Sequence, residues 1–132
     1  MPTLRECRRE VEQLHAFFVE WYAGAVARDR FDRLEGALAP GFGMVTPEGE
    51  RLDRAAVVEA VRTDYGRDDP GEFDIDIRNV ERAADCGACV AVRYEEHQRG
   101  EAETARLSTA ILRESADAPG GLAWLDVHET WL

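Results

Sequence analysis

The segment from Leu122 to Leu132 constrains the fold more than any other part of the chain. It contains two tryptophans together with Leu, Val and Thr, a composition typical of a β-strand. The turn-forming sequence Pro119-Gly120-Gly121 comes directly before it. Large apolar groups occur on both faces of the segment, so neither face can be fully exposed to water. We therefore predict an interior strand of a sheet, against which the preceding elements pack.

The length of 132 residues predicts a single domain, residues 1–132, with one hydrophobic core. No apolar run approaches the roughly 20 residues that are needed to cross a bilayer. The first ten residues also lack the apolar segment of a signal peptide. These features favour a cytoplasmic location.

The chain is strongly acidic, with a net charge of -11. All basic residues are arginine, and they form no compact basic stripe. Nucleic acids and anionic membranes are bound through such stripes, so we expect neither as a partner.

The three cysteines cannot all pair within one chain, which fits reduced thiols in a cytosolic setting. Cys86 and Cys89 have CxxC spacing, and the alternatives for them are a metal or redox role and a structural hairpin edge. The motif stands alone, which favours the hairpin edge. The cysteines and histidines show no metal-ligand spacing on any one element, so we expect no metal and no cofactor.

Three helices are predicted in the first half of the chain. From Leu4 to Ala25, apolar residues recur every three or four positions and form one face of a long helix. Thr3 and Glu6 have the spacing of a capping box at its start. A short helix is predicted around Phe31 to Leu38, and a third is capped by Asp53 and ended by Gly66.

Strands are predicted between and after these helices. A brief strand, Phe42 to Thr46, precedes the third helix. Everything after residue 72 has the period of a sheet, with strands at 73–77, 89–99, 104–113 and 122–132. Three helices that precede a meander of four antiparallel strands predict an α+β fold in which the helices cover one face of the sheet.

The register of the strands decides which side chains can form a site, because a shift of one residue exchanges the two faces. The more apolar alternate set of each strand is expected to face the helices. These inward sets are Val90, Val92, Tyr94 and Glu96; Ala105, Leu107, Thr109 and Ile111; and Leu125, Val127, Glu129 and Trp131. The outer face would then carry Trp124, Asp126, His128 and Thr130 with Arg93, Glu95, His97 and Arg106.

An outer face of this composition predicts self-association. An exposed tryptophan within a polar sheet is a common mark of an interface, and two curved sheets paired back to back would cover Trp124. We therefore expect a homodimer formed through the convex face of the sheet.

Two phrases of the sequence carry a family resemblance, together with the long aromatic N-terminal helix. One is the segment 37–49, ALAPGFGMVTPEG, and the other is 124–131, WLDVHETW. Over nearly the whole chain they resemble the NTF2-like superfamily, closest to its SnoaL-like and DUF4440-type members. The second phrase is similar to the Trp-x-x-Val-His ending of many such proteins, including the association domain of calmodulin-dependent kinase.

The resemblance implies a cone-shaped α+β barrel, open at one end and usually dimeric through the convex sheet. Members include steroid isomerases, polyketide cyclases, epoxide hydrolases, dehydratases, ligand binders and assembly domains, so the fold selects no reaction. The enzymatic branches use an inward Asp or an Asp-Arg-Asp set. Here the inward acids are Glu and the sheet arginines are expected to face outward. The association domain lines its pocket with Arg, where this chain has Tyr94, Thr109 and Trp131.

Glu96 and Glu129 are the leading catalytic candidates. If both face the cone, like charges in an apolar site raise one pKa and leave a general acid beside a general base. The structural alternative places Glu96 at a wet rim and pairs Glu129 with an arginine or with backbone. His128 cannot form a dyad with Glu129, because neighbours on a strand face opposite ways.

The remaining candidates are aromatic and polar residues around the same cone. Tyr94 and Tyr22 could donate hydrogen bonds to a developing oxyanion, or each could be an ordinary core tyrosine. His15 fits the cavity and a half-exposed helix position equally well. The ligand-binding set is completed by Trp21, Met44, Tyr65, Leu107, Thr109 and Trp131.

The predicted function is binding of a small, largely apolar molecule. A catalytic member would carry out isomerisation, dehydration or aldol-type cyclisation by proton transfer, without a metal. The alternative is a non-catalytic dimerisation or ligand-binding module. An open cavity of a few hundred cubic ångströms would favour the first prediction.

Overall fold

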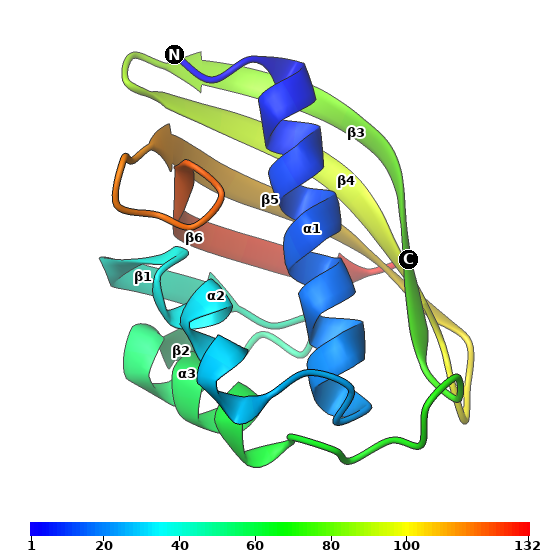
Figure 1. Cartoon of the computed structure of the whole chain (residues 1–132). Coiled ribbons are helices and arrows are strands. Elements are labelled where there is room, and N and C mark those ends of the chain that lie inside the picture. Colours follow the sequence, from blue (N-terminus) through cyan, green and yellow to red (C-terminus); the bar gives the residue numbers. More distant parts are fainter.

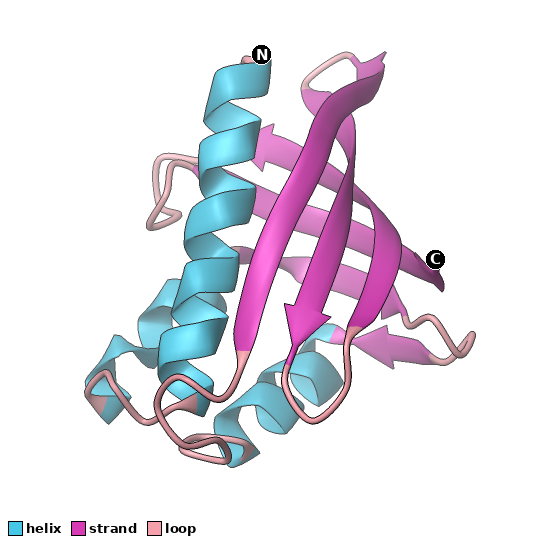
Figure 2. Ribbon diagram, turned by 90° about the vertical axis from the view of Figure 1, so that its right-hand side faces the viewer, coloured by secondary structure: helices cyan, strands magenta, loops and turns pink.

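The computed structural model describes all 132 residues. Helices pack on one side of a six-stranded sheet that is curved but not closed (Figures 1 and 2). The elements in chain order are α1 (Leu4–Tyr22), the 3₁₀ turn η1 (Arg28–Phe31), α2 (Asp32–Glu35), β1 (Leu38–Val45), β2 (Arg51–Asp53), α3 (Arg54–Thr63), β3 (Asp74–Cys86), β4 (Cys89–Arg99), β5 (Thr104–Glu114) and β6 (Leu122–Trp131). None of the helices has a stretch long and apolar enough to cross a membrane.

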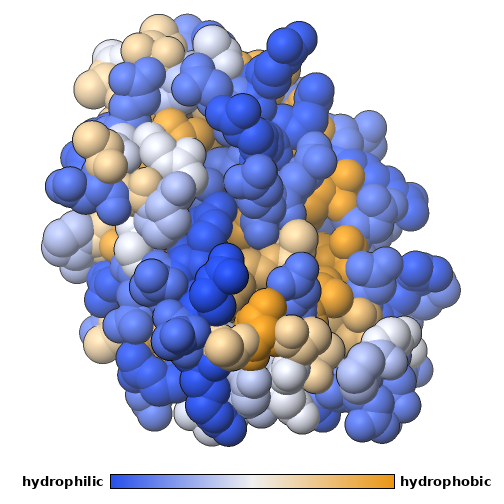
Figure 3. All heavy atoms as spheres, in the orientation of Figure 1, coloured by the Kyte–Doolittle hydropathy of each residue, from blue (hydrophilic) through white to orange (hydrophobic).

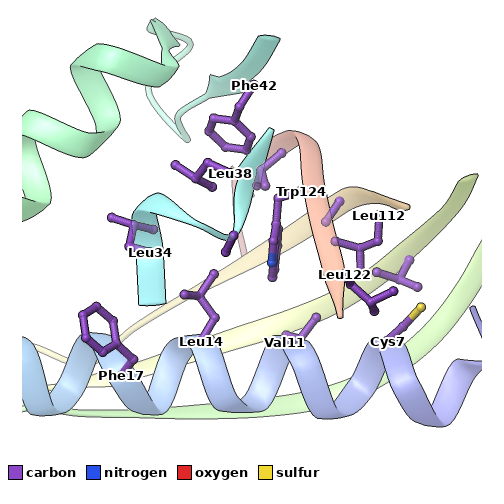
Figure 4. Packing of buried hydrophobic residues seen from close by; sticks show 14 of the residues in the cluster. Cys7, Val11, Leu14, Phe17, Leu34, Leu38, Phe42, Leu112, Leu122 and Trp124 are labelled. Atoms are coloured by element: carbon purple, nitrogen blue, oxygen red, sulfur yellow. The ribbon is translucent and has the colours of Figure 1, made fainter. Parts of the chain in front are cut away.

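The first helix forms as the sequence predicts. The Thr3 side chain accepts from the Glu6 backbone N–H, and the Glu6 side chain accepts from the Thr3 N–H, so the capping box is confirmed. The apolar stripe of α1 lies against the sheet (Figure 4). The helix ends at Tyr22, three residues before the predicted end at Ala25. Gly24, with φ +65°, follows this end.

The second predicted helix lies three residues earlier than expected. It consists of η1 and α2, begins at Arg28 and ends at Glu35, because Leu38 already belongs to β1. The Trp124 N–H donates to the Ala37 carbonyl at 2.8 Å, and β1 runs parallel to β6. Pairing with β6 thus overrides the helix propensity of Ala37 and Leu38, and it extends β1 four residues before the predicted strand. The short strand β2 was not predicted.

The meander of β3, β4, β5 and β6 is confirmed, and the sheet order is β2-β1-β6-β5-β4-β3. The bounds of β4 match the prediction, whereas β3 extends nine residues beyond Ile77. Asn79 adopts φ +55° within a register shift between Arg78 and Glu81, and a second shift follows between Arg82 and Ala84. These bulges bend β3 and β4 around α1, which lies on the concave side of the sheet (Figure 2).

The predicted face of β4 is confirmed, because Val90, Val92, Tyr94 and Glu96 are all buried. The predicted face of β5 is wrong. Its buried residues are Ser108, Ala110 and Leu112, and Ser108 lies opposite Tyr94 in the register. Both faces of β5 carry apolar residues, so hydrophobicity alone does not select between them. Leu107, Thr109, Ala105 and Ile111 therefore lie on the outer face, and Arg106 faces inward.

A bulge in β6 changes which alternate side chains of the strand face inward. The register with β5 shifts between Ile111 and Leu112, so Trp124 faces inward before the bulge, and Val127 and Glu129 face inward after it. The prediction that Trp124 lies on the outer face is wrong, since the side chain is only 2% exposed. His128 is exposed, as predicted.

The core lies between α1, α2 and the concave face of the sheet. Figure 4 shows Trp124 standing between β6 and α1, with Leu112 and Leu122 beside it and Leu34 across from it. The surface on the α1 side is mainly hydrophilic, with small apolar patches between charged side chains (Figure 3). Several residues of this core, including Leu14, Leu38 and Trp124, also border an open space beside it.

Candidate functional site

A cavity of about 290 Å³ lies between the helices and the concave face of the sheet. Its volume is close to the lower end of the range for small-molecule sites, roughly 300 Å³. Fourteen of the twenty lining residues are hydrophobic. The lining residues are Leu14, His15, Phe18, Tyr22, Leu34, Leu38, Phe42, Met44, Val57, Val61, Arg67, Phe73, Ile75, Tyr94, Glu96, Gln98, Arg106, Trp124, Val127 and Glu129.

The strands supply the polar part of the lining through their alternation. Successive inward positions of β4 bring Tyr94, Glu96 and Gln98 to one wall, and the neighbouring strands add Arg106 and Glu129. Arg106 lies opposite Glu96 in the register, and Ser108 lies opposite Glu129. Five polar side chains therefore meet at one end of an otherwise apolar cavity.

His15 and Glu96 form a buried ion pair at this end. The distance from His15 Nε2 to Glu96 Oε1 is 3.0 Å, and His15 Nδ1 lies 2.7 Å from the Val11 carbonyl. The carbonyl can only accept, so Nδ1 carries a hydrogen, and a charged carboxylate requires a second one on Nε2. Burial opposes charge on the ring, but the Glu96 carboxylate and the two hydrogen bonds raise the pKa of His15.

Glu96 is held in its ionised form by the same contacts. Burial favours the neutral acid, but the charge and hydrogen bond of His15, with a hydrogen bond from Gln98, lower the pKa of Glu96 to about 2. A carboxylate of such low basicity is a poor proton acceptor near neutral pH. Its effect on a ligand is therefore electrostatic.

The pKa of Glu129 is raised, in contrast to that of Glu96. It accepts from Arg106 Nη1 at 3.1 Å and from Ser108 Oγ at 3.2 Å. Burial and the nearby charge of Glu96 raise the pKa of Glu129, against the opposing effect of Arg106. Two carboxyls that line the same cavity, one from β4 and one from β6, thus titrate in different ranges, and Glu129 is the one that gains a proton first as the pH falls.

The two tyrosines of the lining remain protonated. Burial, with the charges of Glu96 and Glu129, raises the pKa of Tyr94 well above its usual value. Burial also raises the pKa of Tyr22 to about 12. Both phenols can therefore serve only as neutral hydrogen-bond donors or acceptors toward a ligand.

The cavity opens beside the segment that joins α3 to β3. The Arg67 guanidinium lies 3.8 Å from the centre of the Tyr22 ring and 5.2 Å from that of Phe73. Arg67 is partly exposed, and Tyr22 and Phe73 are half-buried. A cation between two aromatic rings thus frames the mouth.

Six of the eleven predicted site residues line the cavity: Glu129, Glu96, Tyr94, His15, Tyr22 and Met44. The other five do not. Trp21 is in the core and donates to the Val61 carbonyl, and Tyr65 donates to the Val26 carbonyl. Leu107 and Thr109 lie on the outer face, and Trp131 is 46% exposed beneath Arg106.

The sequence interpretation missed Arg106, Trp124, Gln98, Arg67 and Phe73. Arg106 and Trp124 were assigned to the outer face, and both assignments are wrong for the register reasons given above. A different signal could have found Arg106. With Glu96 inward on β4, the turn at residues 100–103 places residue 106 opposite it, and a buried carboxylate needs a cationic neighbour.

The cysteines and acids form no further centre. No group of three His, Cys, Asp or Glu side chains is arranged to hold a metal ion. Cys86 and Cys89 lie opposite each other at the tip of the hairpin between β3 and β4, and Cys7 is buried in the core.

Comparisons with known proteins agree with the fold. Residues 7–132 match the family described as "Sucrose-6-phosphate phosphohydrolase C-terminal". No curated protein matches the chain. An NTF-2 like protein of unknown function from Pseudomonas aeruginosa is 32% identical over 96% of this chain and 98% of that chain, with a TM-score of 0.86.

Two more distant structures share the fold alone. The CaMKII hub of S. rosetta is 12% identical over the whole of both chains, with a TM-score of 0.74. The beta subunit of benzoate 1,2-dioxygenase from Burkholderia mallei is 15% identical over 100% of this chain and 93% of that chain, with a TM-score of 0.73. The predicted α+β, NTF2-like architecture is thus confirmed, and the chain belongs to the Sucrose-6-phosphate phosphohydrolase C-terminal family of NTF2-like fold.

Proposed function

We propose that the protein binds a small, largely apolar molecule in the cavity and exchanges a proton with it through Glu129. One observation carries this proposal: an apolar cavity of about 290 Å³ ends at a buried carboxyl whose pKa is raised. A carboxyl of raised pKa in a cavity is suited to general acid and base work near neutral pH. The carboxyl and its neighbouring donors come from the adjacent strands β4, β5 and β6.

Each polar residue has a distinct role in this proposal. Glu129 would take a proton from, or return it to, a carbon beside a carbonyl group of the ligand. The Tyr94 hydroxyl and the Arg106 guanidinium would donate to the carbonyl oxygen as negative charge develops there. The ion pair of His15 and Glu96 acts as a positioning group that fixes the charge next to Glu129. Isomerisation, dehydration and aldol-type cyclisation all use this step.

A ligand screen by thermal shift tests the proposal, with small enones, aromatic acids and other carboxylates as probes. Ligands that enter the cavity should raise the melting temperature of the wild-type protein. Met44→Trp should abolish the shift, because it adds bulk to the lining. Val45→Trp, the neighbouring position of β1 whose side chain faces the other way, is the matched control.

The proton-transfer part is tested by Glu129→Gln. This variant should keep ligand binding and lose any conversion of a bound enone, which isotope exchange from deuterated water detects at the carbon beside the carbonyl. If no probe shifts the melting temperature of the wild-type protein, the proposal of a ligand site fails. If exchange is as fast in the variant as in the wild type, the role of Glu129 fails.

Self-association through the convex sheet is a second candidate function, and the outer face favours it. Leu107 and Ile111 are only half-buried there. The chain also shares its fold with the CaMKII hub of S. rosetta. We propose a homodimer in a cytoplasmic setting. Analytical ultracentrifugation should show a dimer that Ile111→Glu splits and that the control Ala16→Glu, at an exposed position of α1, leaves intact. A wild-type monomer would contradict it.

A further inference from the structure

Arg106 is a mostly buried arginine that uses few of its hydrogen-bond donors. Its side chain is 17% exposed, and its one hydrogen bond is from Nη1 to Glu129 at 3.1 Å. Its Nε atom is fully enclosed and is the only buried side-chain nitrogen or oxygen without a partner. A guanidinium has five N–H donors, so most of the capacity of this one is unused.

Other partly buried arginines of the chain differ in this respect. Arg33 donates from both terminal nitrogens to Glu10, at 2.8 and 3.2 Å. Arg54 donates from Nε to the Leu38 carbonyl and from Nη2 to the Glu35 carbonyl. Neither contributes to the cavity lining, whereas Arg106 does. Unmet donors are thus concentrated at the arginine that a ligand can approach, and they call for an acceptor that the chain does not supply.

The charges around Arg106 show what kind of acceptor fits. His15 neutralises Glu96, and Gln98 donates to the second oxygen of Glu96. This leaves Arg106 and Glu129 as the remaining charged pair at the polar end. Trp131 covers one face of the guanidinium, with its ring centre 4.7 Å away, so the cation is shielded from bulk water. A planar anion would use the free donors best.

We propose that the ligand of the cavity is a small monocarboxylate with an apolar body, held by Arg106, and that its binding is coupled to the uptake of one proton by Glu129. This inference rests on the proposed function, which requires a ligand in the same cavity. It adds the chemical class of that ligand and a charge balance that the ligand must satisfy.

Proton uptake follows from the charge count. The groups that face Glu129 are Arg106 and Ser108 from β5, Glu96 and Tyr94 from β4, and His15 from α1. A ligand carboxylate beside Arg106 would share one guanidinium with Glu129, and two carboxylates at such a distance cannot both stay ionised in a buried site. Glu129 has the raised pKa, so it takes the proton and enters the proton exchange of the proposed function as the acid. The filled site is then neutral overall.

The apolar part of the lining describes the body of the ligand. Phe18, Leu38, Val127 and Trp124 face the space next to the polar end. The volume of about 290 Å³ accommodates one aromatic or alicyclic ring with a short chain. Arylalkanoic and cycloalkanecarboxylic acids therefore match both the polar end and the apolar wall.

Matched acid and amide pairs test the inference by isothermal titration calorimetry. The probes are benzoate, cyclohexanecarboxylate and 3-phenylpropionate, each with its primary amide, which has the same shape and no charge. At about pH 7.5 we expect at least one acid to bind roughly tenfold or more tightly than its amide. Titrations in two buffers of different ionisation enthalpy should show about one proton taken up per acid bound.

Variants separate the two parts of the inference. Arg106→Met should weaken acid binding by roughly tenfold or more and leave amide binding nearly unchanged. Arg93→Met, an exposed arginine on the other face of the neighbouring strand, should change neither. Glu129→Gln should abolish proton uptake and bind the acid at least as tightly as the wild type, because the competing carboxylate is gone.

Each outcome decides between the inference and the proposed function. If amides bind as tightly as acids and Met44→Trp abolishes that binding, the carboxylate inference fails while the proposed function stands. If acids bind without proton uptake, or if Arg106→Met leaves acid binding unchanged, the inference fails in that part. If neither acids, amides nor enones bind to the wild-type protein, both proposals fail together.

Discussion

Two buried pairs of glutamate and arginine lie in this small domain, and they differ in how fully they are satisfied. Glu10 of α1 is 1% exposed and accepts three hydrogen bonds, two from Arg33 and one from Trp124 Nε1 at 2.9 Å. Glu129 of β6 is 5% exposed and accepts one hydrogen bond from Arg106 and one from Ser108. Only the second pair borders the cavity.

The difference shows what each pair contributes. The Glu10 pair joins α1, α2 and β6, and the backbone of Gly120 lies directly against its carboxylate. Such a saturated and enclosed pair can only hold the fold together. The Glu129 pair has spare donors on its arginine and open space beside it, so it can bind and titrate. Burial alone does not separate structural from functional charges; the unmet hydrogen-bond capacity does.

The largest predicted effect on stability comes from replacing the arginine of each pair in turn. Arg33→Met should lower the free energy of unfolding by about 3–5 kcal/mol, because Glu10 remains as an enclosed charge without a cation. Arg106→Met should lower it by only about 1–2 kcal/mol, since Glu129 borders a cavity and can take up a proton. Urea unfolding measures both. Equal losses would remove the distinction between the two pairs.

Gly120→Ala should show how tightly the structural pair is enclosed. A Cβ atom at this position would lie 2.0 Å from Glu10 Oε1. Arg33 Nη2 holds that oxygen and Trp124 Nε1 holds Oε2, so the carboxylate cannot easily move away. We expect a loss of about 2–3 kcal/mol in the free energy of unfolding. Gly41→Ala is the control, because nothing lies within 4 Å of its added Cβ. A loss no larger than that of the control would mean that the Glu10 pair yields easily.

The sequence predicts one of these pairs better than the other. Glu129 was predicted to face inward because alternation along β6 is local information. The Glu10 pair went unrecognised, because nothing in the spacing of α1 shows that Arg33 will lie across from it. Arg106 was assigned to the wrong face since both sides of β5 are apolar. Its position is determined by pairing with β4, which single-strand patterns do not contain.

The fold was more predictable than the site for the same reason. The cap at Thr3, the turn before Leu122 and the length of β4 depend on nearby residues, and all were predicted correctly. The bulge that turns Trp124 inward, and the parallel pairing of β1 with β6, depend on partners distant in sequence. A cavity is formed by such partners, so its lining is the last feature that a sequence reveals.

The ion pair of His15 and Glu96 should shape the pH dependence of stability. The pKa of Glu96 in the folded state is about 2, below its ordinary 4.5, so its contribution is present above pH 4.5 and is lost as the pH falls from there toward 2. The pKa of His15 is raised above 6.5, so its contribution is present below pH 6.5 and is lost as the pH rises through the raised pKa.

Glu96→Gln tests this dependence. The variant should lose about 2 kcal/mol between pH 4.5 and 6.5, where both partners contribute, and the loss should shrink at lower and at higher pH. Glu95→Gln, at the half-buried neighbour on the opposite face, is the control and should have a smaller effect. A pH-independent loss in Glu96→Gln would mean that the pair is held by packing rather than by charge.

The smallest predicted effect is a gain in stability, for Glu129→Gln, where the other variants lose stability. The pKa of Glu129 is raised above 4.5 in the folded state, so the folded protein holds this proton more tightly than the unfolded chain, and stability falls as the pH rises from 4.5 through the raised pKa. Glu129→Gln removes that loss. At about pH 7.5 it should be as stable as the wild type or up to about 1 kcal/mol more stable.

Glu10→Gln is the matched substitution in the other pair and should be destabilising by about 2 kcal/mol, because it replaces a carboxylate that accepts three hydrogen bonds. Urea unfolding of both variants at two pH values therefore compares the same chemical change in two settings. A loss in Glu129→Gln as large as that in Glu10→Gln would make Glu129 a structural carboxylate. An unchanged or higher stability of Glu129→Gln, beside a loss in Glu10→Gln, would instead support the role proposed for Glu129 in the cavity.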